Sequence, residues 1–251
     1  MIDLSGRRVL VTGGSRGIGA ACCRMFAAAG AAVAVHYHRN EAAARRVLAD
    51  LDPVAHASHW TFGGDLDDRA QVAKLFAEVS ERWGALDCLV NNAGIWVRNP
   101  IADLDVEAFE ETLRVNVTGP FLCARSAIKL LRRSTDGNIV NLTSTAGQRG
   151  EAHYSPYAAS KGAMISATKA WSTELAPGIR VNSVAPGWVD TDMCAEPFAG
   201  EGKERIAGSI PLGRVATPED IAGPVLFLSS LLARHVTGEI LNVNGGSVLV
   251  G

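Results

Sequence analysis

The chain has 251 residues, of which 47% are hydrophobic and 20% are charged, and its formal net charge is −2. This composition is typical of a globular protein with a large core, and the balanced charge argues against a nucleic-acid surface, which needs clustered Lys and Arg. No apolar stretch approaches the ~20 residues of a membrane span, and the first residues lack the apolar run of a signal peptide. We therefore expect a cytoplasmic protein that binds neither nucleic acid nor membrane.

Strand-like and helix-like segments alternate along the whole chain. Short apolar runs predict strands at 8–11, 32–37, 55–62, 86–90, 139–142, 180–184 and 239–243. Helical patterns occupy 18–29, 41–51, 67–83, 105–133, 156–175 and 217–232. Asn40 can cap the second of these helices, and Gly119-Pro120 predicts a kink in the fourth. This alternation predicts an α/β fold, a doubly wound parallel sheet of about seven strands with helices on both faces. No linker or repeat interrupts the pattern, so we expect a single domain over residues 1–251.

The least regular segment is 193–209, which holds Gly200, Gly202 and Gly208 together with Pro197 and Phe198. Long irregular segments in compact domains are often functional lids. The pattern predicts either a substrate flap with some helix or a long solvated loop.

Five cysteines form an odd set without the spacing of metal ligands. We expect reduced packing residues and no metal site. A catalytic thiol is the alternative, although the sequence offers none of them an obvious histidine partner. The five are Cys22, Cys23, Cys88, Cys123 and Cys194.

A glycine-rich loop separates the first predicted strand from the first predicted helix. It reads Thr12-Gly13-Gly14-Ser15-Arg16-Gly17-Ile18-Gly19. Gly13 allows a tight turn, while Gly17 and Gly19 let the backbone approach a phosphate and let the helix pack closely on the sheet. The helix N-terminus would then face a pyrophosphate with free N–H groups. The loop therefore predicts a dinucleotide site that includes Gly13, Ser15, Arg16, Gly17, Ile18 and Gly19.

Tyr157 and Lys161 lie four residues apart in a predicted helix, and Ser144 precedes the tyrosine by thirteen residues. Residues i and i+4 share a helix face, so a lysine ammonium can lower the tyrosine pKa from its ordinary value of ~10. Such a tyrosine can protonate the alkoxide that forms when a ketone accepts hydride, while the serine orients the carbonyl. Each residue alone has an ordinary structural explanation, but together with the glycine loop they predict a hydride-transfer enzyme.

Further motifs follow in order. Asn91-Asn92-Ala93-Gly94 ends the fourth predicted strand, Asn116 lies in the next helix, and Pro186-Gly187-Trp188-Val189-Asp190-Thr191 follows the sixth strand. With the TGxxxGxG spacing of the glycine loop, the chain resembles the short-chain dehydrogenase/reductase family over essentially its whole length. It is most similar to the 3-oxoacyl-[acyl-carrier-protein] reductase type. The resemblance implies a Rossmann-type fold.

The resemblance also implies roles for individual residues. Tyr157 would be the acid/base, Ser144 the carbonyl orienter, and Lys161 the residue that lowers the tyrosine pKa and binds the nicotinamide ribose. Asn116 would hold a water in a proton relay to Lys161. Asp65, whose ordinary explanation is a helix N-terminal acid, would bind the adenine with Leu66 beside it. The remaining implied cofactor contacts are Asn92, Ala93, Gly94, Pro186, Gly187, Val189 and the carboxamide-binding Thr191.

The end of the second predicted strand bears on the choice between NAD and NADP. It reads Val35-His36-Tyr37-His38-Arg39-Asn40 and holds no carboxylate to accept from a ribose 2′-OH. Arg16 and Arg39 could instead bind a 2′-phosphate. The sequence therefore favours NADP(H), with Arg39 as a solvated surface charge the alternative.

The substrate is expected to be a small-molecule ketone or secondary alcohol. A 3-oxoacyl thioester is one candidate, and a cyclic, aromatic or sugar substrate is the alternative. Thr173 precedes Glu174 where carrier-protein-binding relatives often carry a basic residue, which makes an acyl carrier protein a doubtful partner. Candidate substrate contacts, besides Ser144, are Trp96, Gln148, Tyr154 and Trp188.

The resemblance further implies a homotetramer, because Asn242-Val243-Asn244-Gly245-Gly246 resembles a segment that pairs subunits in the family. Two other functions stay open. One is a nucleotide-binding sensor that has lost the chemistry, which the presence of Ser144, Tyr157 and Lys161 disfavours. The other is a lyase or epimerase, which the length of the chain disfavours.

Overall fold

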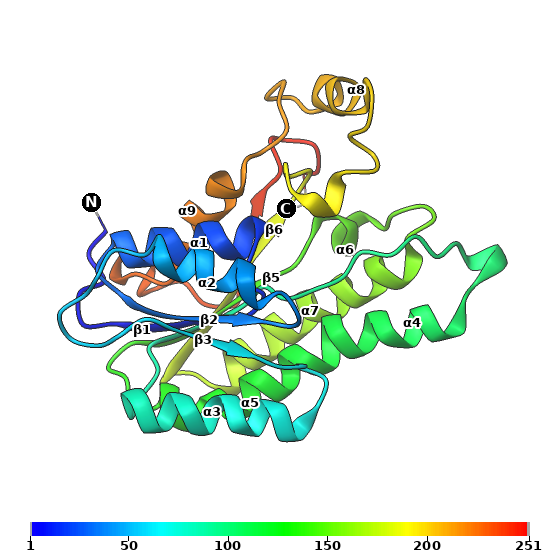
Figure 1. The fold of residues 1–251 in the computed structure, drawn as a ribbon. Helices are drawn as coiled ribbons and strands as arrows, with labels where there is room; N and C mark the ends of the chain where they lie inside the picture. The colour runs from blue at the N-terminus through cyan, green and yellow to red at the C-terminus, as the bar shows by residue number, and fades with distance from the viewer. Residues whose placement is uncertain (1, 250–251) are drawn as a thin grey trace.

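The computed structural model describes residues 2–249, and its centre is one seven-stranded sheet in which all neighbouring strands are parallel (Figure 1). The strand order is β3-β2-β1-β4-β5-β6-β7. The predicted doubly wound sheet is therefore confirmed. The strands are β1 (Arg8–Val11), β2 (Ala32–Tyr37), β3 (Trp60–Gly63), β4 (Cys88–Asn91), β5 (Gly137–Leu142), β6 (Ile179–Pro186) and β7 (Ile240–Val243).

Helices cover both faces of the sheet (Figure 1). One buried cluster joins Val9 and Val11 of β1 to helices α1, α2 and α9, whereas Leu10 belongs to the cluster under α3, α5 and α7. Each central strand thus buries both faces, which is why it is a continuous apolar run in the sequence. The α-helices are α1 (Gly17–Ala28), α2 (Glu41–Ala49), α3 (Arg69–Trp83), α4 (Val106–Leu113), α5 (Gly119–Leu131), α6 (Thr145–Arg149), α7 (Ser155–Glu174), α8 (Gly202–Ser209) and α9 (Pro218–Leu228).

Shorter helical turns complete the described chain. They are η1 (Ile101–Asp103), the π-helical η2 (Arg114–Thr118), η3 (Asp192–Cys194) and η4 (Leu231–Ala233). Asn40 caps α2 by accepting from the N–H of Ala43, as predicted. Helix α3 begins at Arg69 with Asp68 as its cap, two residues after the predicted start at 67. Asp68 accepts from two first-turn N–H groups of the helix, which fixes the boundary.

Two predicted elements differ from the structure. The third strand begins at Trp60 rather than near residue 55. A longer β3 would pair with the Val33 N–H of β2 through a backbone carbonyl, but this N–H donates to the His59 imidazole at 3.0 Å instead. The helical stretch expected over 105–133, with a kink at Gly119-Pro120, is divided by the π-helical η2 into α4 and α5, and α5 begins at Gly119. Such π turns inside helices frequently accompany functional sites, and η2 contains Asn116.

The order of the strands reverses between β1 and β4. Val9–Val11 of β1 pair with β2 on one side and with β4 on the other, and all of these strands end at the same edge. Ligands of open parallel sheets bind outside the carboxyl ends of the strands at such a point. The glycine loop follows β1 and therefore lies there.

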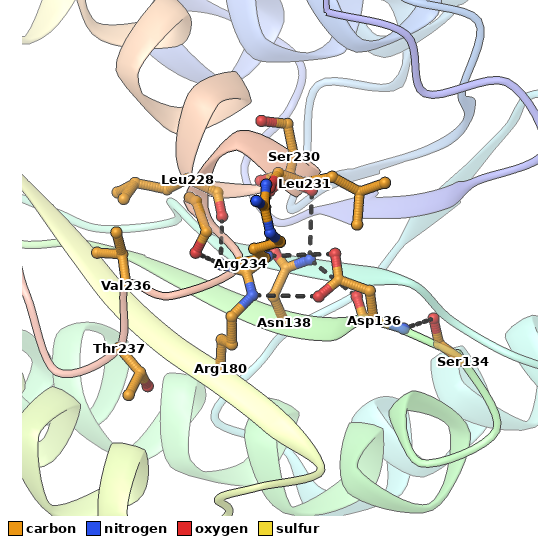
Figure 2. A network of polar contacts seen from close by, with 12 residues as sticks. Ser134, Asp136, Asn138, Arg180, Leu228, Ser230, Leu231, Arg234, Val236 and Thr237 are labelled. Carbon is orange, nitrogen blue, oxygen red and sulfur yellow. Dashed lines mark hydrogen bonds and ion pairs between the residues drawn. The ribbon is translucent and has the colours of Figure 1, made fainter.

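The opposite, amino edge of the sheet holds a buried polar network around Arg180 (Figure 2). The Arg180 guanidinium bonds Asp136 through Nε at 3.1 Å, and its Nη1 donates to the carbonyls of Leu228 at 2.8 Å and Ala233 at 3.1 Å. Since Leu228 ends α9, the network satisfies carbonyls that the helix itself leaves free. It ties β5, β6 and the segment after α9 together.

Within residues 2–249, every helix is too short or too polar to cross a lipid bilayer. All five cysteines are free thiols; Cys194 is partly exposed, and the other four are buried. Burial raises the pKa of Cys88 and Cys123 to about 12, so these two are packing residues rather than nucleophiles.

Candidate active site

A cavity of about 640 Å³ opens at the carboxyl edge of the sheet. Its wall is built by the glycine loop after β1, the ends of β2, β4, β5 and β6, and the first two turns of α7. Segments far apart in the sequence therefore meet in one place. The predicted site residues that line it are Gly13, Ser15, Arg16, Gly17, Ile18, Gly19, Arg39, Asp65, Leu66, Asn92, Ala93, Gly94, Trp96, Ser144, Tyr157, Lys161, Pro186, Gly187, Trp188, Val189 and Thr191.

The glycine loop has the tight geometry that its sequence predicts. Gly13 has a φ of +63°, in the left-handed region, and a Cβ there would lie 3.0 Å from the Ala93 Cα. A Cβ on Gly19 would collide with the Gly13 carbonyl oxygen. Both glycines are thus required for α1 to start directly against the loop.

The N-terminus of α1 faces the cavity without a competing anion. Its N-cap residue, Arg16, makes no side-chain hydrogen bond to the helix, and the first turn contains no acidic residue. The first-turn N–H groups and the positive end of the helix dipole are therefore available to an anion. These residues fit the pyrophosphate of a dinucleotide.

Thr12 connects the loop to the end of β4. Its Oγ1 accepts from the N–H groups of Asn92 at 2.9 Å and Ala93 at 3.1 Å. The Asn92 side chain returns two hydrogen bonds, to the carbonyls of Thr12 and Gly13. Thr12 belongs to the TGxxxGxG motif, but the sequence alone did not indicate that its hydroxyl joins the two cofactor-binding segments.

His36 is a second positioning residue, and its contact with the glycine loop was not predicted from the sequence. It is buried at the end of β2, where Nδ1 accepts from the Gly13 N–H at 3.2 Å and Nε2 lies 3.0 Å from the Gly64 carbonyl. These partners require the neutral ring with its proton on Nε2. Burial lowers the pKa of His36 to about 4, so the ring stays neutral near pH 7 and holds the glycine loop.

Charged side chains line the cavity next to the ends of β2 and β3. Arg39, Asp65 and Arg16 all border it, and they are joined there by His38. His38 Nε2 lies 3.6 Å from the Asp65 carboxylate, while Arg16 Nη1 lies 3.7 Å from Asp192. Both pairs are largely exposed, so each is weak and can exchange its partner for a ligand.

Ser144, Tyr157 and Lys161 meet at the other end of the cavity. Ser144 follows β5 and caps α6 by accepting from the Ala146 N–H at 3.1 Å. Lys161 Nζ donates to the Leu142 carbonyl at 2.8 Å and lies 5.7 Å from the centre of the Tyr157 ring. One helical turn of α7 thus brings the ammonium to the phenol, as the spacing predicts.

The pKa values of these groups are strongly perturbed. Burial lowers the pKa of Lys161 to about 8. Burial also raises the pKa of Tyr157 well above its usual value, and a hydrogen bond with Ser144 opposes this rise. The tyrosine therefore stays protonated near neutral pH and can act as an acid. Perturbed groups in a cleft are typical of a catalytic site.

Asn116 lies behind the cavity wall rather than in it. Its Oδ1 accepts from the Ile95 N–H at 2.8 Å, and its Nδ2 donates to the Ile95 carbonyl and to Ser160 Oγ. A Cβ added to Gly94 would come within 3.2 Å of Asn116 Oδ1 and 3.5 Å of Lys161 Nζ. Asn116 therefore holds the segment after β4 against α7, and the water relay to Lys161 stays a prediction.

Two of the predicted substrate contacts are not part of the cavity lining in the described chain. Gln148 is turned toward β7, where its Nε2 donates to Asn242 Oδ1 at 2.6 Å. Tyr154 stacks on Trp96 with ring centres 4.3 Å apart and supports that ring from behind. Trp96 and Trp188 do line the cavity and meet edge to face at 5.9 Å.

Comparisons with known proteins agree with this geometry. A family model described as Enoyl-(Acyl carrier protein) reductase matches residues 13–247. A solved structure of a short-chain dehydrogenase/reductase, named glucose/ribitol dehydrogenase, from Brucella melitensis is 34% identical, covers 99% of both chains and has a TM-score of 0.92. The chain belongs to the short-chain dehydrogenase/reductase family. It is an oxidoreductase, and the resemblance drawn from the motifs is confirmed.

Curated members of this family are similar over nearly the whole chain. The 3-oxoacyl-[acyl-carrier-protein] reductase FabG of Aquifex aeolicus is 37% identical, with 98% of each chain covered. A 3alpha-hydroxysteroid dehydrogenase of Mediterraneibacter gnavus is 41% identical, with 97% of this chain and 98% of that protein covered. Relatives at similar identity thus carry names that imply chemically different substrates.

Proposed function

We propose that this protein is an NADP(H)-dependent oxidoreductase that transfers a hydride between the nicotinamide and a ketone or secondary alcohol. The observation that carries the proposal is that Ser144, Tyr157 and Lys161 line the same cavity as the glycine loop. A proton donor and a dinucleotide site therefore share one space, which is what carbonyl reduction requires.

The mechanism assigns one task to each residue. The nicotinamide, when bound, supplies the hydride in reduction and accepts it in oxidation. In reduction the Tyr157 hydroxyl gives its proton to the substrate oxygen as charge develops there, and Ser144 donates a hydrogen bond to the same oxygen. The Lys161 ammonium, 5.7 Å from the centre of the Tyr157 ring, would stabilise the resulting phenolate and so oppose the rise that burial causes in the Tyr157 pKa. In oxidation the phenolate takes the proton from the alcohol.

The preference for NADP(H) rests on charge at the adenine end of the cavity. Arg39 and Arg16 border this end, and the tip of β2 offers no carboxylate to a ribose 2′-OH. The carboxylate that is near, Asp65, lies opposite His38. Guanidinium groups bind phosphate well, so a 2′-phosphate is the better fit.

The test is NADPH oxidation with acetoacetyl-CoA, a simple 3-oxoacyl thioester, with NADH and the Tyr157→Phe variant measured in parallel. Rapid turnover that needs both NADPH and Tyr157 is expected if the thioester is a substrate. NADPH binding without turnover keeps the oxidoreductase function and directs the search to cyclic and sugar ketones. Absence of NADPH binding contradicts the proposal.

Three further expectations belong to the same proposal. One domain, residues 1–251, would carry both the cofactor site and the substrate site. Residues 193–209 would form a flap over the substrate, since Met193 and Cys194 line the cavity and α8 projects beyond the sheet (Figure 1). The protein would be a cytoplasmic homotetramer, which sedimentation of the purified chain would test. An acyl carrier protein stays the weaker partner, because Thr173 replaces a basic residue.

A further inference from the structure

Glu151 and Arg149 lie at the substrate end of the cavity and have no role in the mechanism above. Both line the cavity together with Tyr157 and Trp96. Glu151 is half-buried, and burial raises its pKa, although a hydrogen bond from Trp96 opposes the rise. A carboxylate kept beside the reacting centre at this cost needs an explanation in terms of the substrate.

The turn that presents Glu151 is held in place. The Tyr154 N–H donates to the Glu151 carbonyl at 3.2 Å, and His153 between them has a φ of +67°. The Asn99 N–H donates to the His153 carbonyl at 2.8 Å and fixes the turn to the segment after β4. A non-glycine residue in the left-handed region persists only where its surroundings enforce it.

Trp96 orients the carboxylate. Its Nε1 donates to Glu151 Oε2 at 3.3 Å, and one face of its ring is covered by Tyr154. The centres of the Trp96 and Tyr157 rings lie 6.4 Å apart, with an angle of 70° between the ring planes. The carboxylate and the catalytic tyrosine are therefore connected through one rigid aromatic ring. A substrate whose carbonyl reaches Tyr157 brings its neighbouring atoms close to Glu151.

The Glu151 carboxylate retains unused acceptor capacity. A carboxylate has about four acceptor positions, and across residues 2–249 the one hydrogen bond recorded to this side chain comes from Trp96. Arg149, five donors on a planar fork, takes part in none of the ion pairs of the described chain. The cavity lining thus offers an acceptor on the half-buried Glu151 and a set of donors on the exposed Arg149.

Four kinds of substrate can be compared against this pair. An anionic substrate is repelled by Glu151, and a cationic one by Arg149. An apolar ring or acyl chain would cover both groups without replacing their water hydrogen bonds, which disfavours binding. Hydroxyl groups both donate and accept, so vicinal hydroxyls satisfy the two charges together. Trp188 and Trp96 add apolar ring surface for the C–H face of such a molecule.

We propose that Glu151 and Arg149 form a subsite that selects a neutral, polyhydroxylated substrate, a ketose or its polyol, with Glu151 as the specificity-determining residue. This inference rests on the hydride-transfer function proposed above. In the oxidising direction the Tyr157 phenolate would take the proton of the carbinol hydroxyl, and NADP⁺ would accept the hydride of the same carbon. The hydroxyl on the next carbon donates to Glu151 and is not consumed.

The experiment measures the purified full-length protein with NADP⁺ and ribitol, sorbitol or galactitol, and with NADPH and fructose. Cyclohexanone and acetoacetyl-CoA serve as ketones without a vicinal hydroxyl. We expect the best polyol or ketose to have the highest kcat/KM. Glu151→Gln should lower that kcat/KM by about tenfold or more, mostly through KM, while turnover of cyclohexanone changes less.

Two controls separate the possible failures. Glu107→Gln makes the same charge change on the exposed surface of α4 and should leave every rate unchanged. Polyol binding to the NADPH complex is also measured by calorimetry, so that the result does not depend on turnover. If no substrate is turned over but polyols still bind in a way that depends on Glu151, the proposed hydride-transfer function is contradicted and the subsite is supported.

Other outcomes overturn the subsite itself. These are higher kcat/KM for acetoacetyl-CoA or cyclohexanone than for every polyol and ketose, absence of polyol and ketose binding, or an equal loss with all substrates in Glu151→Gln. The last result would mean that Glu151 only supports Trp96 and the turn.

Discussion

The two edges of the sheet bury charged side chains in opposite ways. At the amino edge, Arg180 is surrounded by Asp136 and by the carbonyls of Leu228 and Ala233, so its charge is compensated (Figure 2). At the carboxyl edge, Lys161 is equally buried, and its recorded hydrogen bond in the described chain goes to the neutral Leu142 carbonyl. The same sheet therefore holds one buried cation with a carboxylate partner and another without one.

The difference has a measurable consequence in the pKa values. Burial without a carboxylate partner lowers the pKa of Lys161 to about 8. A cation whose proton is easily lost, next to a tyrosine whose proton is firmly held, is suited to proton transfer. The amino edge has no such mismatch, because each charge meets the opposite one. A buried charge without an opposite charge beside it thus distinguishes the carboxyl edge, which holds the cavity, from the amino edge.

The largest expected effect is the loss of turnover in Tyr157→Phe. The variant keeps the ring but removes the proton donor, so kcat should fall by about 10³-fold, while NADPH affinity and the free energy of unfolding stay within about twofold and ~1 kcal/mol of the wild type. Steady-state rates and urea unfolding measure this. Tyr37→Phe, a tyrosine at the end of β2, is the matched control, and retained turnover in Tyr157→Phe would contradict the mechanism.

Arg180→Met should show the reverse pattern at the amino edge. Removing the guanidinium leaves Asp136 with less compensation and frees the carbonyls of Leu228 and Ala233, so the free energy of unfolding should fall by about 3–5 kcal/mol. The kcat of the protein that stays folded should change little. The control is Arg234→Met, which removes an exposed arginine near the same network and should lower the free energy of unfolding by less than ~1 kcal/mol. Equal stability of Arg180→Met and the wild type would mean that the network contributes nothing.

Lys161→Met sharpens the comparison through pH. In the cofactor-free wild type, Lys161 is neutral above about pH 8 when folded but stays charged to about 10.5 when unfolded. The unfolded state therefore binds more protons in this window, and stability from this group rises with pH by up to about 3 kcal/mol. Lys161→Met should lack this rise, whereas Lys169→Met on the exposed side of α7 should keep it. If the stability of the wild type and of Lys161→Met changes in parallel between pH 8 and 10.5, the pKa of Lys161 is not lowered in the folded protein.

His36 predicts a smaller effect on the acid side. Its pKa is about 4 when folded and 6.5 as an ordinary value, so the unfolded state binds more protons as pH falls below 6.5. Stability should drop by about 2 kcal/mol between pH 6.5 and 5 in the wild type, and this part of the drop should be absent in His36→Asn. The exposed His38→Asn is the control in urea unfolding at both pH values. The same pH dependence in all three proteins would show that His36 does not hold the glycine loop through its neutral ring.

The smallest expected effect concerns the cofactor. Arg39→Asp should weaken NADPH binding by about tenfold and NADH binding much less, because the new carboxylate repels a 2′-phosphate. Fluorescence titration of both cofactors measures the ratio, with the exposed Arg45→Asp on α2 as the matched change. Equal weakening of NADPH and NADH would remove Arg39 as the phosphate-binding residue.

Local patterns allowed much of the fold and site to be predicted. The apolar runs of β1, β2 and β5 bury both faces and are therefore visible without knowledge of neighbours. The spacing of Tyr157 and Lys161 on α7 places both side chains at the cavity because a helix has a fixed period. Positions near the ends of elements were less predictable, as the cap of α3 and the start of β3 show.

Contacts between distant segments could not be predicted in the same way. Gln148 is near Tyr157 in the sequence, but its side chain bonds Asn242, which lies 94 residues later in β7. Asn116 is placed by a π-helical turn that its own sequence does not announce. In both cases a partner from another element decided where a polar side chain points.

The sequence by itself determined the order of elements, the glycine loop and the Ser144, Tyr157 and Lys161 set, because each depends on a period or a steric requirement that acts over a few residues. Only the tertiary structure decided that Thr12 and His36 hold the loop, that Glu151 lines the same cavity as Tyr157, and that Lys161 is buried with its pKa lowered. These properties depend on solvent exclusion and on hydrogen bonds between segments that meet only when the parallel sheet brings the ends of its strands together.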